Sequence, residues 1–361
     1  MVRHSSRDYL CCLAPSPIVT CQPLPNQFTL STCDDILSHN VLRIFIWLIG
    51  ILSTVCNILS IIWHAKNTTK GTRIVTVLLI NLSVGDLIMG IYLITITFAN
   101  IYYAGTLAEY LEIWLRSPIC SIATLFISTS GLMSTIILFF ITLDRFLHLV
   151  FPFSDYRLSY ATIVTAMVIS WILCLGYVGL PIIFSINQPS QLRLHGSNSV
   201  CLPGNLVNTY FLIWLISYCL STFLIWITIA ILYAIILYTL KTARKEAHRK
   251  TSKADKIIQY KMITIVFTDL ICWMPLYIVL LRYFFGYGLD THSLPFIAIL
   301  SLPLNSCINP ILYTIYTQKF LNIASTVLQK FRCCVMCGLK KNQSEVHQGH
   351  QFLCKIYMQQ K

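Results

Sequence analysis

The stretch MITIVFTDLICWMPLYIVLL, residues 262–281, decides the fold class of this chain. It is apolar from end to end except for two threonines and one carboxylate, Asp269, near its middle. An α-helix needs about 20 consecutive apolar residues to cross the hydrocarbon core of a bilayer. The stretch therefore predicts a membrane-spanning helix, and it raises the question of why an acid lies inside that helix.

Other stretches have the same character and bring the number of predicted spans to seven. The spans cover residues 41–65, 74–99, 119–144, 160–186, 206–240, 259–282 and 293–316. The composition agrees, because 56% of the 361 residues are hydrophobic and only 11% are charged, which is too apolar for a soluble protein of this length. We predict an all-α membrane protein, a bundle of seven transmembrane helices.

The positions of Lys and Arg predict the orientation of this bundle. Residues 64–73, 145–160, 241–261 and the segment from 317 onward hold 20 of the 26 Lys and Arg residues, whereas the opposite loops hold Arg116 and Arg193. Because positive residues stay on the cytoplasmic side, we expect the N-terminus outside and the C-terminus inside. The net charge of +13 thus lies beside membrane spans, where topology and anionic lipid account for it, and nucleic acid is not an expected partner.

The segments outside the spans complete the predicted domain organisation. Residues 1–40 form a short extracellular arm, 41–316 the transmembrane domain, 317–332 an amphipathic juxtamembrane helix and 333–361 a cytoplasmic tail. Cys333 and Cys334 follow the amphipathic helix and are candidates for palmitoylation, which would attach it to the bilayer. The alternative is a zinc site from Cys334 and Cys337 with His347, His350 or Cys354; it is less favoured because a second CxxC is missing.

Three carboxylates fall within the spans, namely Asp86, Asp144 and Asp269. A charged group at bilayer depth costs a few kcal/mol by insertion scales and usually faces the interior of a helix bundle. Each of these acids therefore needs a partner or an environment that neutralises it.

A cation site is one interpretation of Asp86. In LPLNSCINPILY, residues 302–313, Asn305 and Asn309 are four residues apart and share a helix face, which Tyr313 extends. Together with Asp86 and Ser134, these amides can surround one small hydrated cation with hard oxygen ligands. The alternative is a hydrogen-bonded cluster that only packs helices, and spacing alone slightly favours it.

Asp269 also has two interpretations. It shares a helix face with Trp273, and Pro275 removes the hydrogen bond to the carbonyl of Ile271, so the helix is expected to bend or loosen there. A buried acid below such a bend makes a hinge. The alternative, equally favoured by spacing, is an ordinary bend and a protonated, inert acid.

The two ends of the third span carry different chemistry. Asp144, Arg145 and Phe146 lie at its inner end, and Cys120 lies 25 residues before Arg145, a helical rise of about 38 Å. Cys120 is therefore placed at the outer surface, where it can meet Cys201, although six external cysteines leave the pairing open. For a lone Arg at an inner helix end, snorkelling and the charge bias are the competing explanation.

Together these residues resemble the rhodopsin-like G-protein-coupled receptors over residues 41–332. The motifs that carry the resemblance are Asn57, NLSVGD, Cys120, DRF, Trp171, CWMP and NPILY, each occurring once and in the family's order. The resemblance implies a plasma-membrane receptor that binds an extracellular agonist and catalyses nucleotide exchange on a heterotrimeric G protein. It also assigns roles: G-protein coupling to Asp144, Arg145 and Phe146; switching to Trp273, Pro275, Asn309, Pro310 and Tyr313; and a sodium site to Asp86, Ser134, Asn305 and Asn309.

Asp269 refines the resemblance, because most members of the family have Phe at this position. FTDLICWMP, LPLNSCINPILY, residues 33–50 and residues 85–93 look like the leucine-rich-repeat subfamily, the relaxin-family peptide and glycoprotein-hormone receptors. In that subfamily the acid bonds to the amides of the seventh helix, which implies that Asp269 accepts from Asn305 or Asn309. This resemblance favours the hinge and adds Asp269 and Asn305 to the switch residues. The implied agonist is a peptide or protein hormone, with a relaxin-like peptide as one candidate.

Other classes of function remain as alternatives to a receptor. Only 40 residues precede the first span and none shows a leucine-rich repeat, so a truncated receptor product is one alternative. A transporter or channel could use Asp86, Asp269 and the two amides as an ion path, but no inverted repeat is visible. No arrangement of catalytic residues occurs in the spans, so we expect no enzyme and no cofactor beyond the candidate sodium ion.

Overall fold

The computed structural model describes residues 30–32, 34–69, 72–151, 157–186, 188, 193–195, 198–205, 208–247, 253–285 and 293–315. The chain divides into two units, Met1–Pro310 and Ile311–Lys361. The described residues are helical or irregular, and none of them lies in a β-strand.

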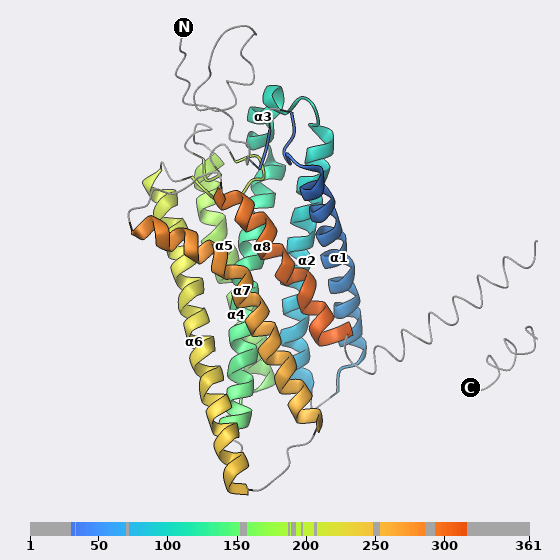
Figure 1. The fold of residues 1–361 in the computed structure, drawn as a ribbon, viewed down its shortest axis with the longest axis vertical. Coiled ribbons are helices and arrows are strands. Elements are labelled where there is room, and N and C mark those ends of the chain that lie inside the picture. The colour runs from blue at the N-terminus through green and yellow to red at the C-terminus, as the bar shows by residue number, and fades with distance from the viewer. Residues whose placement is uncertain are drawn as a thin grey trace, which may run out of the picture. The chain divides into compact units, whose positions relative to one another are not determined.

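Seven long helices of the first unit correspond to the seven predicted spans (Figure 1). They are α1 (Asn40–Lys66), α2 (Arg73–Tyr102), α4 (Pro118–Val150), α5 (Tyr160–Ile186), α6 (Thr209–Ala247), α7 (Lys253–Phe284) and α8 (Ser293–Pro310). Helix α1 packs against α2 and α8, α4 packs against α2, α5 and α6, and α7 packs against α8. The predicted all-α bundle is confirmed.

Length and composition show which helices can cross a membrane. Among the described residues, α1, α2, α4, α5 and residues Thr209–Thr239 of α6 are long and apolar enough, and α7 and α8 contain shorter apolar segments. Large apolar side chains such as Val41 and Ile44 of α1 and Ile172 and Leu180 of α5 are exposed. Helix α4 is the most buried of the five. This distribution is that of a bundle whose outer surface faces lipid.

A short helix that the sequence reasoning missed, α3 (Leu107–Arg116), lies between α2 and α4. We expected a loop there because the segment is too short to span a bilayer. Its buried residues Leu107, Leu111, Trp114 and Leu115 nevertheless follow the spacing of one helix face, and that pattern was the signal available in the sequence.

The residues just before α1 are packed, although residues 1–40 were predicted to be an arm. Leu30, Ile36 and Leu37 are buried. The backbone N–H of Leu37 donates to Oδ1 of Asn100 at 2.8 Å, near the end of α2. The carbonyl of Asp34 accepts from the N–H of Gly105 at 2.8 Å. The described part of this segment is therefore fixed to the end of the bundle that carries α3.

Helix α8 ends at Pro310, earlier than the predicted end at 316. Residues Ile311–Ile315, including Tyr313, form a π-helical turn in the second unit. Proline cannot donate a helical hydrogen bond, which accounts for the change of helix type at this point. The predicted amphipathic helix, the tail, Cys333, Cys334 and the zinc alternative lie outside the described residues, as does most of the N-terminal arm.

Candidate functional site

Asp86 of α2 lies fully buried in the bundle and is the centre of a polar cluster. The hydroxyl of Ser134 on α4 donates to its Oδ1 at 3.2 Å, and the amide of Asn309 on α8 donates to its Oδ2 at 3.0 Å. The side chain of Ser306 also interacts with the carboxylate. Three helices thus contribute to one buried acid and its donors, as the sequence predicted for Asp86, Ser134 and Asn309.

Asp269 of α7 is also fully buried, yet neither carboxylate oxygen has a hydrogen-bond partner among the described residues. The expected bond from Asn305 or Asn309 is not formed in this arrangement. Asn309 donates to Asp86 instead, at 3.0 Å. The structure thus corrects the pairing: the Asn309 amide of α8 bonds to the acid of α2 and not to the acid of α7.

The polar cluster contains further oxygen atoms without donors. Oδ1 of Asn305 and Oδ1 of Asn309 are buried and accept no hydrogen bond within the part of the chain that the structure describes. With the carboxylate of Asp86 and the hydroxyl of Ser134, Oδ1 of Asn309 completes a set of hard oxygen atoms with one formal negative charge, and Asn305 lies one turn earlier on the same face of α8. Such a set fits a small monovalent cation.

A second interaction between helices depends on Pro310. Because proline has no N–H, the carbonyl of Ser306, four residues earlier, lacks its helical donor. Nδ2 of Asn57 on α1 donates to this carbonyl at 2.9 Å, and the hydroxyl of Ser53 lies at 3.4 Å. The proline therefore leaves a backbone carbonyl of α8 without a helical donor, and side chains of α1 donate to it.

Trp273 of α7 is buried at the centre of an aromatic group. Its ring stacks on Tyr277 at 5.8 Å between centroids, and Tyr218 of α6 lies at 6.4 Å. A Cβ atom at Gly131 of α4 would come within 3.3 Å of the Trp273 ring and 2.8 Å of the Tyr218 hydroxyl. The absence of a side chain at Gly131 therefore allows both aromatic residues to reach α4. Pro275 lies inside α7, two residues beyond Trp273.

Asp144, Arg145 and Phe146 lie in the last turns of α4, as predicted. The carboxylate of Asp144 is buried, with Arg145 Nε at 3.7 Å and Nδ1 of His148 at 3.5 Å. Neither approach is a hydrogen bond in length, and Arg145 Nε has no hydrogen-bond partner among the residues that the structure describes. Phe146 contacts Phe151 at 5.8 Å between ring centroids. His148, one turn after Asp144, is a neighbour that the sequence reasoning missed.

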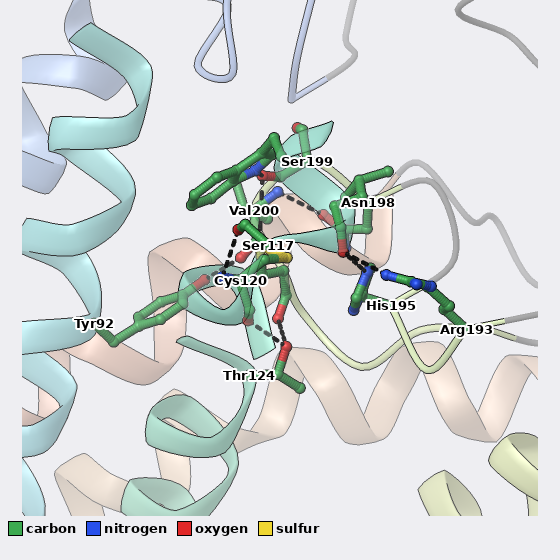
Figure 2. Close-up of a disulfide and its surroundings, with 12 residues drawn as sticks. Tyr92, Ser117, Cys120, Thr124, Arg193, His195, Asn198, Ser199 and Val200 are labelled. Carbon is green, nitrogen blue, oxygen red and sulfur yellow. Dashed lines mark hydrogen bonds between the residues drawn. A yellow bond between two sulfur atoms is a disulfide. The ribbon is translucent and has the colours of Figure 1, made fainter. Parts of the chain in front are cut away.

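Cys120 at the start of α4 forms a disulfide with Cys201, the partner that the sequence analysis put forward, and this pairing is confirmed (Figure 2). Donors surround it: Tyr92 donates to the carbonyl of Val200 at 2.9 Å, and Thr124 donates to the carbonyl of Cys201 at 2.7 Å. Nε1 of Trp114 on α3 donates to the carbonyl of Ser199 at 2.7 Å. The loop at residues 198–205 is thus joined to α2, α3 and α4.

Arg193 and His195 extend this attachment. Arg193 donates to the carbonyls of Gln188, Ile186 and Leu115, each at 3.2 Å. Nε2 of His195 lies 2.9 Å from the same Leu115 carbonyl, so Nε2 carries the proton. Burial lowers the pKa of His195 to about 4; the bond to Leu115 opposes this change, and the charge of Arg193 adds to it. His195 is therefore neutral at physiological pH.

Comparison with known proteins agrees with this geometry. Residues 56–313 match the family described as 7 transmembrane receptor (rhodopsin family), which is more than half of the chain. The matched range includes Asp86, Ser134, Arg145, Asp269 and Asn309.

The chain matches individual relatives over most of its own length, but it spans less than half of the length of each of them. G-protein coupled receptor GRL101 of Lymnaea stagnalis is 32% identical over 326 residues, 89% of this chain and 28% of that protein. Relaxin receptor 2 of Canis lupus familiaris is 30% identical over 89% of this chain and 44% of that protein. Follicle-stimulating hormone receptor of Notamacropus eugenii is 28% identical over 92% of this chain and 46% of that protein. This multi-pass protein of the plasma membrane therefore belongs to the rhodopsin family of seven-transmembrane receptors.

Proposed function

We propose that the chain transmits an extracellular signal across the plasma membrane to a heterotrimeric G protein. One observation carries the proposal: the range that matches the receptor family encloses the buried cluster in which Asp86, Ser134 and Asn309 join α2, α4 and α8. A receptor needs buried polar contacts that can be exchanged between two helix arrangements. The family match does not favour a transporter or channel, and it favours a receptor over an enzyme.

The charge pattern and the contacts at the two ends support one orientation. The end with α3 and the disulfide faces outward, where disulfides persist, and the end with Arg145 faces the cytoplasm. Arg145 is suited to contact a G protein, because its side chain is 26% exposed and its nearest acid is 3.7 Å away. The agonist is proposed to be a peptide or protein hormone, because the relatives are named as relaxin and follicle-stimulating hormone receptors.

A sodium ion is proposed as a ligand of the resting protein, held by Asp86, Ser134, Asn305 and Asn309. The support is the buried Oδ1 of Asn309, whose amide contacts the Asp86 carboxylate, and the buried Oδ1 of Asn305 one turn earlier on α8; neither oxygen accepts a hydrogen bond from the described residues. A bound cation would supply positive charge to this cluster and stabilise the helix arrangement that encloses it.

The test is nucleotide exchange on purified Gα subunits by membranes that contain the chain, measured without agonist. We expect exchange above that of empty membranes, and Arg145→Ala should lower it at least about tenfold, as expected when a charged contact in the activated state is lost. Arg116→Ala is the matched control, because Arg116 pairs with Glu112 on the surface of α3 and should leave exchange unchanged.

Ion flux or solute uptake by the same membranes, with no exchange on any Gα class, would replace the receptor by a transport function. Equal exchange by the Arg145→Ala and unmodified proteins would remove Arg145 from the coupling surface.

A further inference from the structure

Helix α5 contains a proline that leaves one backbone carbonyl without a helical donor, and a side chain of another helix donates to that carbonyl. Pro181 lies inside α5 and has no N–H, so the carbonyl of Tyr177, one turn earlier, has no helical donor. Nε1 of Trp214 on α6 donates to this carbonyl at 3.1 Å. The arrangement is the same as that at Pro310, where the side chain of Asn57 donates to the carbonyl of Ser306.

Further contacts join Tyr177 to the same turn of α6. The Tyr177 hydroxyl is hydrogen-bonded to the hydroxyl of Ser217, which itself donates to the Trp214 carbonyl at 2.8 Å. The rings of Tyr177 and Trp214 are 5.8 Å apart. We call these four residues, Tyr177, Pro181, Trp214 and Ser217, the proline contact. It ties the position of α6 to a backbone atom of α5.

Trp214 is connected to Trp273 through one residue. Tyr218, one turn further along α6, contacts the ring of Trp214 at 5.5 Å and that of Trp273 at 6.4 Å. Its hydroxyl donates to the carbonyl of Ser128 on α4 at 2.9 Å, over the space that Gly131 leaves. Because α6 contains no proline, Trp214 and Tyr218 are carried by one regular helix and move together.

The other end of the route reaches the outer loop. Beyond Pro181, the hydroxyl of Ser185 accepts from the N–H of Leu194 at 2.8 Å, and Arg193 donates to the carbonyl of Ile186 at 3.2 Å. Arg193 also holds the carbonyl of Leu115 on α3. Ser185 lies in the last turn of α5, one turn beyond Pro181. This turn is therefore attached to the loop that also contains Cys201 of the disulfide.

We infer that Trp214 is a positioning residue. Its hydrogen bond to the Tyr177 carbonyl fixes α6 in the position in which Tyr218 holds Trp273 against α4. A displacement of the outer loop is transmitted through α5 to Trp273. The effect on signalling rests on the proposed receptor function, whereas the seating of Trp273 does not. The seated arrangement is the resting one, so loss of the bond releases Trp273 and raises exchange in the absence of agonist.

A double-mutant cycle tests the hydrogen bond. Trp214→Phe keeps a ring but removes the donor, and should raise agonist-free exchange per receptor at the surface about fivefold, the effect of one buried hydrogen bond. Pro181→Ala supplies an N–H for the Tyr177 carbonyl, so in that background Trp214→Phe should change exchange less than about twofold. Trp226→Phe is the matched control, because Trp226 is buried on the same helix and its indole N–H has no partner in the described part of the chain. It should also change exchange less than about twofold.

A second readout is independent of G proteins. In protein labelled with 5-fluorotryptophan, the ¹⁹F resonance of Trp273, assigned by its loss in Trp273→Phe, should move in Trp214→Phe and remain in place in Trp226→Phe. If Trp214→Phe does not reach the membrane, Pro181→Ala takes its place, since it keeps every ring and should move the same resonance in the same direction.

The outcomes separate the two proposals. A Trp273 resonance that moves while no variant drives exchange would support the positioning role and reject the receptor function. Exchange by the unmodified protein, together with an unmoved Trp273 resonance or with equal Trp214→Phe effects in both backgrounds, would overturn the positioning role.

Discussion

The polar groups at the disulfide end of the bundle and those around Asp86 and Asp269 are buried to a similar degree but satisfied differently. At the disulfide end, the side chains of Tyr92, Trp114 and Thr124 each donate to a loop carbonyl. In the interior, both oxygens of Asp269 and the Oδ1 atoms of Asn305 and Asn309 accept no hydrogen bond from any described residue. A satisfied network holds one arrangement, whereas an excess of acceptors leaves several arrangements close in energy. The contrast fits a fixed outer end above an interior that can rearrange.

The largest expected effect is at the disulfide end. Cys120→Ser removes a cross-link between residues 81 positions apart, which should cost about 4 kcal/mol of unfolding free energy. We expect a lower melting temperature in detergent and reduced delivery to the cell surface. Cys56→Ser is the control, because Cys56 is a free cysteine of α1. Equal melting temperatures for Cys120→Ser and the unmodified protein would show that the hydrogen bonds alone fix this end.

His195 provides a pH test of the same end. Its pKa is about 4 in the folded protein and 6.5 in the reference state, so between these values the unfolded chain binds the extra proton. Stability is then full above pH 6.5 and falls as the pH is lowered toward 4, by about 3 kcal/mol in total. Replacement by Gln, which cannot titrate, should flatten the melting temperature over this window relative to the unmodified protein. Parallel pH curves for the two proteins would contradict the assignment to His195.

The smallest expected effect compares the two interior acids. Asp86→Leu leaves the Ser134 hydroxyl and the Asn309 amide without an acceptor and should destabilise the protein by about 2 kcal/mol. Asp269→Leu removes a group without partners and should leave stability unchanged or raise it by about 1 kcal/mol. Melting in sodium and in potassium buffers adds a test of the cation: only Asp86→Leu should abolish a sodium-specific rise. Equal losses in both variants would mean that Asp269 has a partner of its own.

Much of the fold could be predicted because the information is local. Runs such as residues 262–281 are long and apolar enough to require a helix in lipid, and the seven predicted spans correspond to seven helices. Helix α3 was missed because its ten residues are too few to span a membrane, although the spacing of its apolar residues was visible in the sequence. The packing of residues 34–39 had no local signal, because it depends on Asn100 and Gly105 of another segment.

The site was predictable in its membership and not in its pairings. Spacing on α8 placed Asn305 and Asn309 on one face, and composition marked Asp86 and Asp269 as the interior acids. Which acid receives the Asn309 amide depends on how α2, α7 and α8 approach one another, and that distance is set by packing across the bundle. The same holds for Pro181 and Pro310: the sequence shows that each proline leaves a carbonyl without a donor, but not that Trp214 and Asn57 would fill them.

The sequence by itself determined the class of this protein, its membrane spans and the residues that belong in its interior, because hydrophobicity and helical spacing act over short stretches of chain. Tertiary structure alone decided that the Asn309 amide donates to Asp86, that Asp269 has no hydrogen-bond partner among the described residues and that Trp214 donates to the carbonyl of Tyr177. These outcomes are competitions among donors and acceptors from different helices. Their result follows from distances that only the assembled bundle fixes.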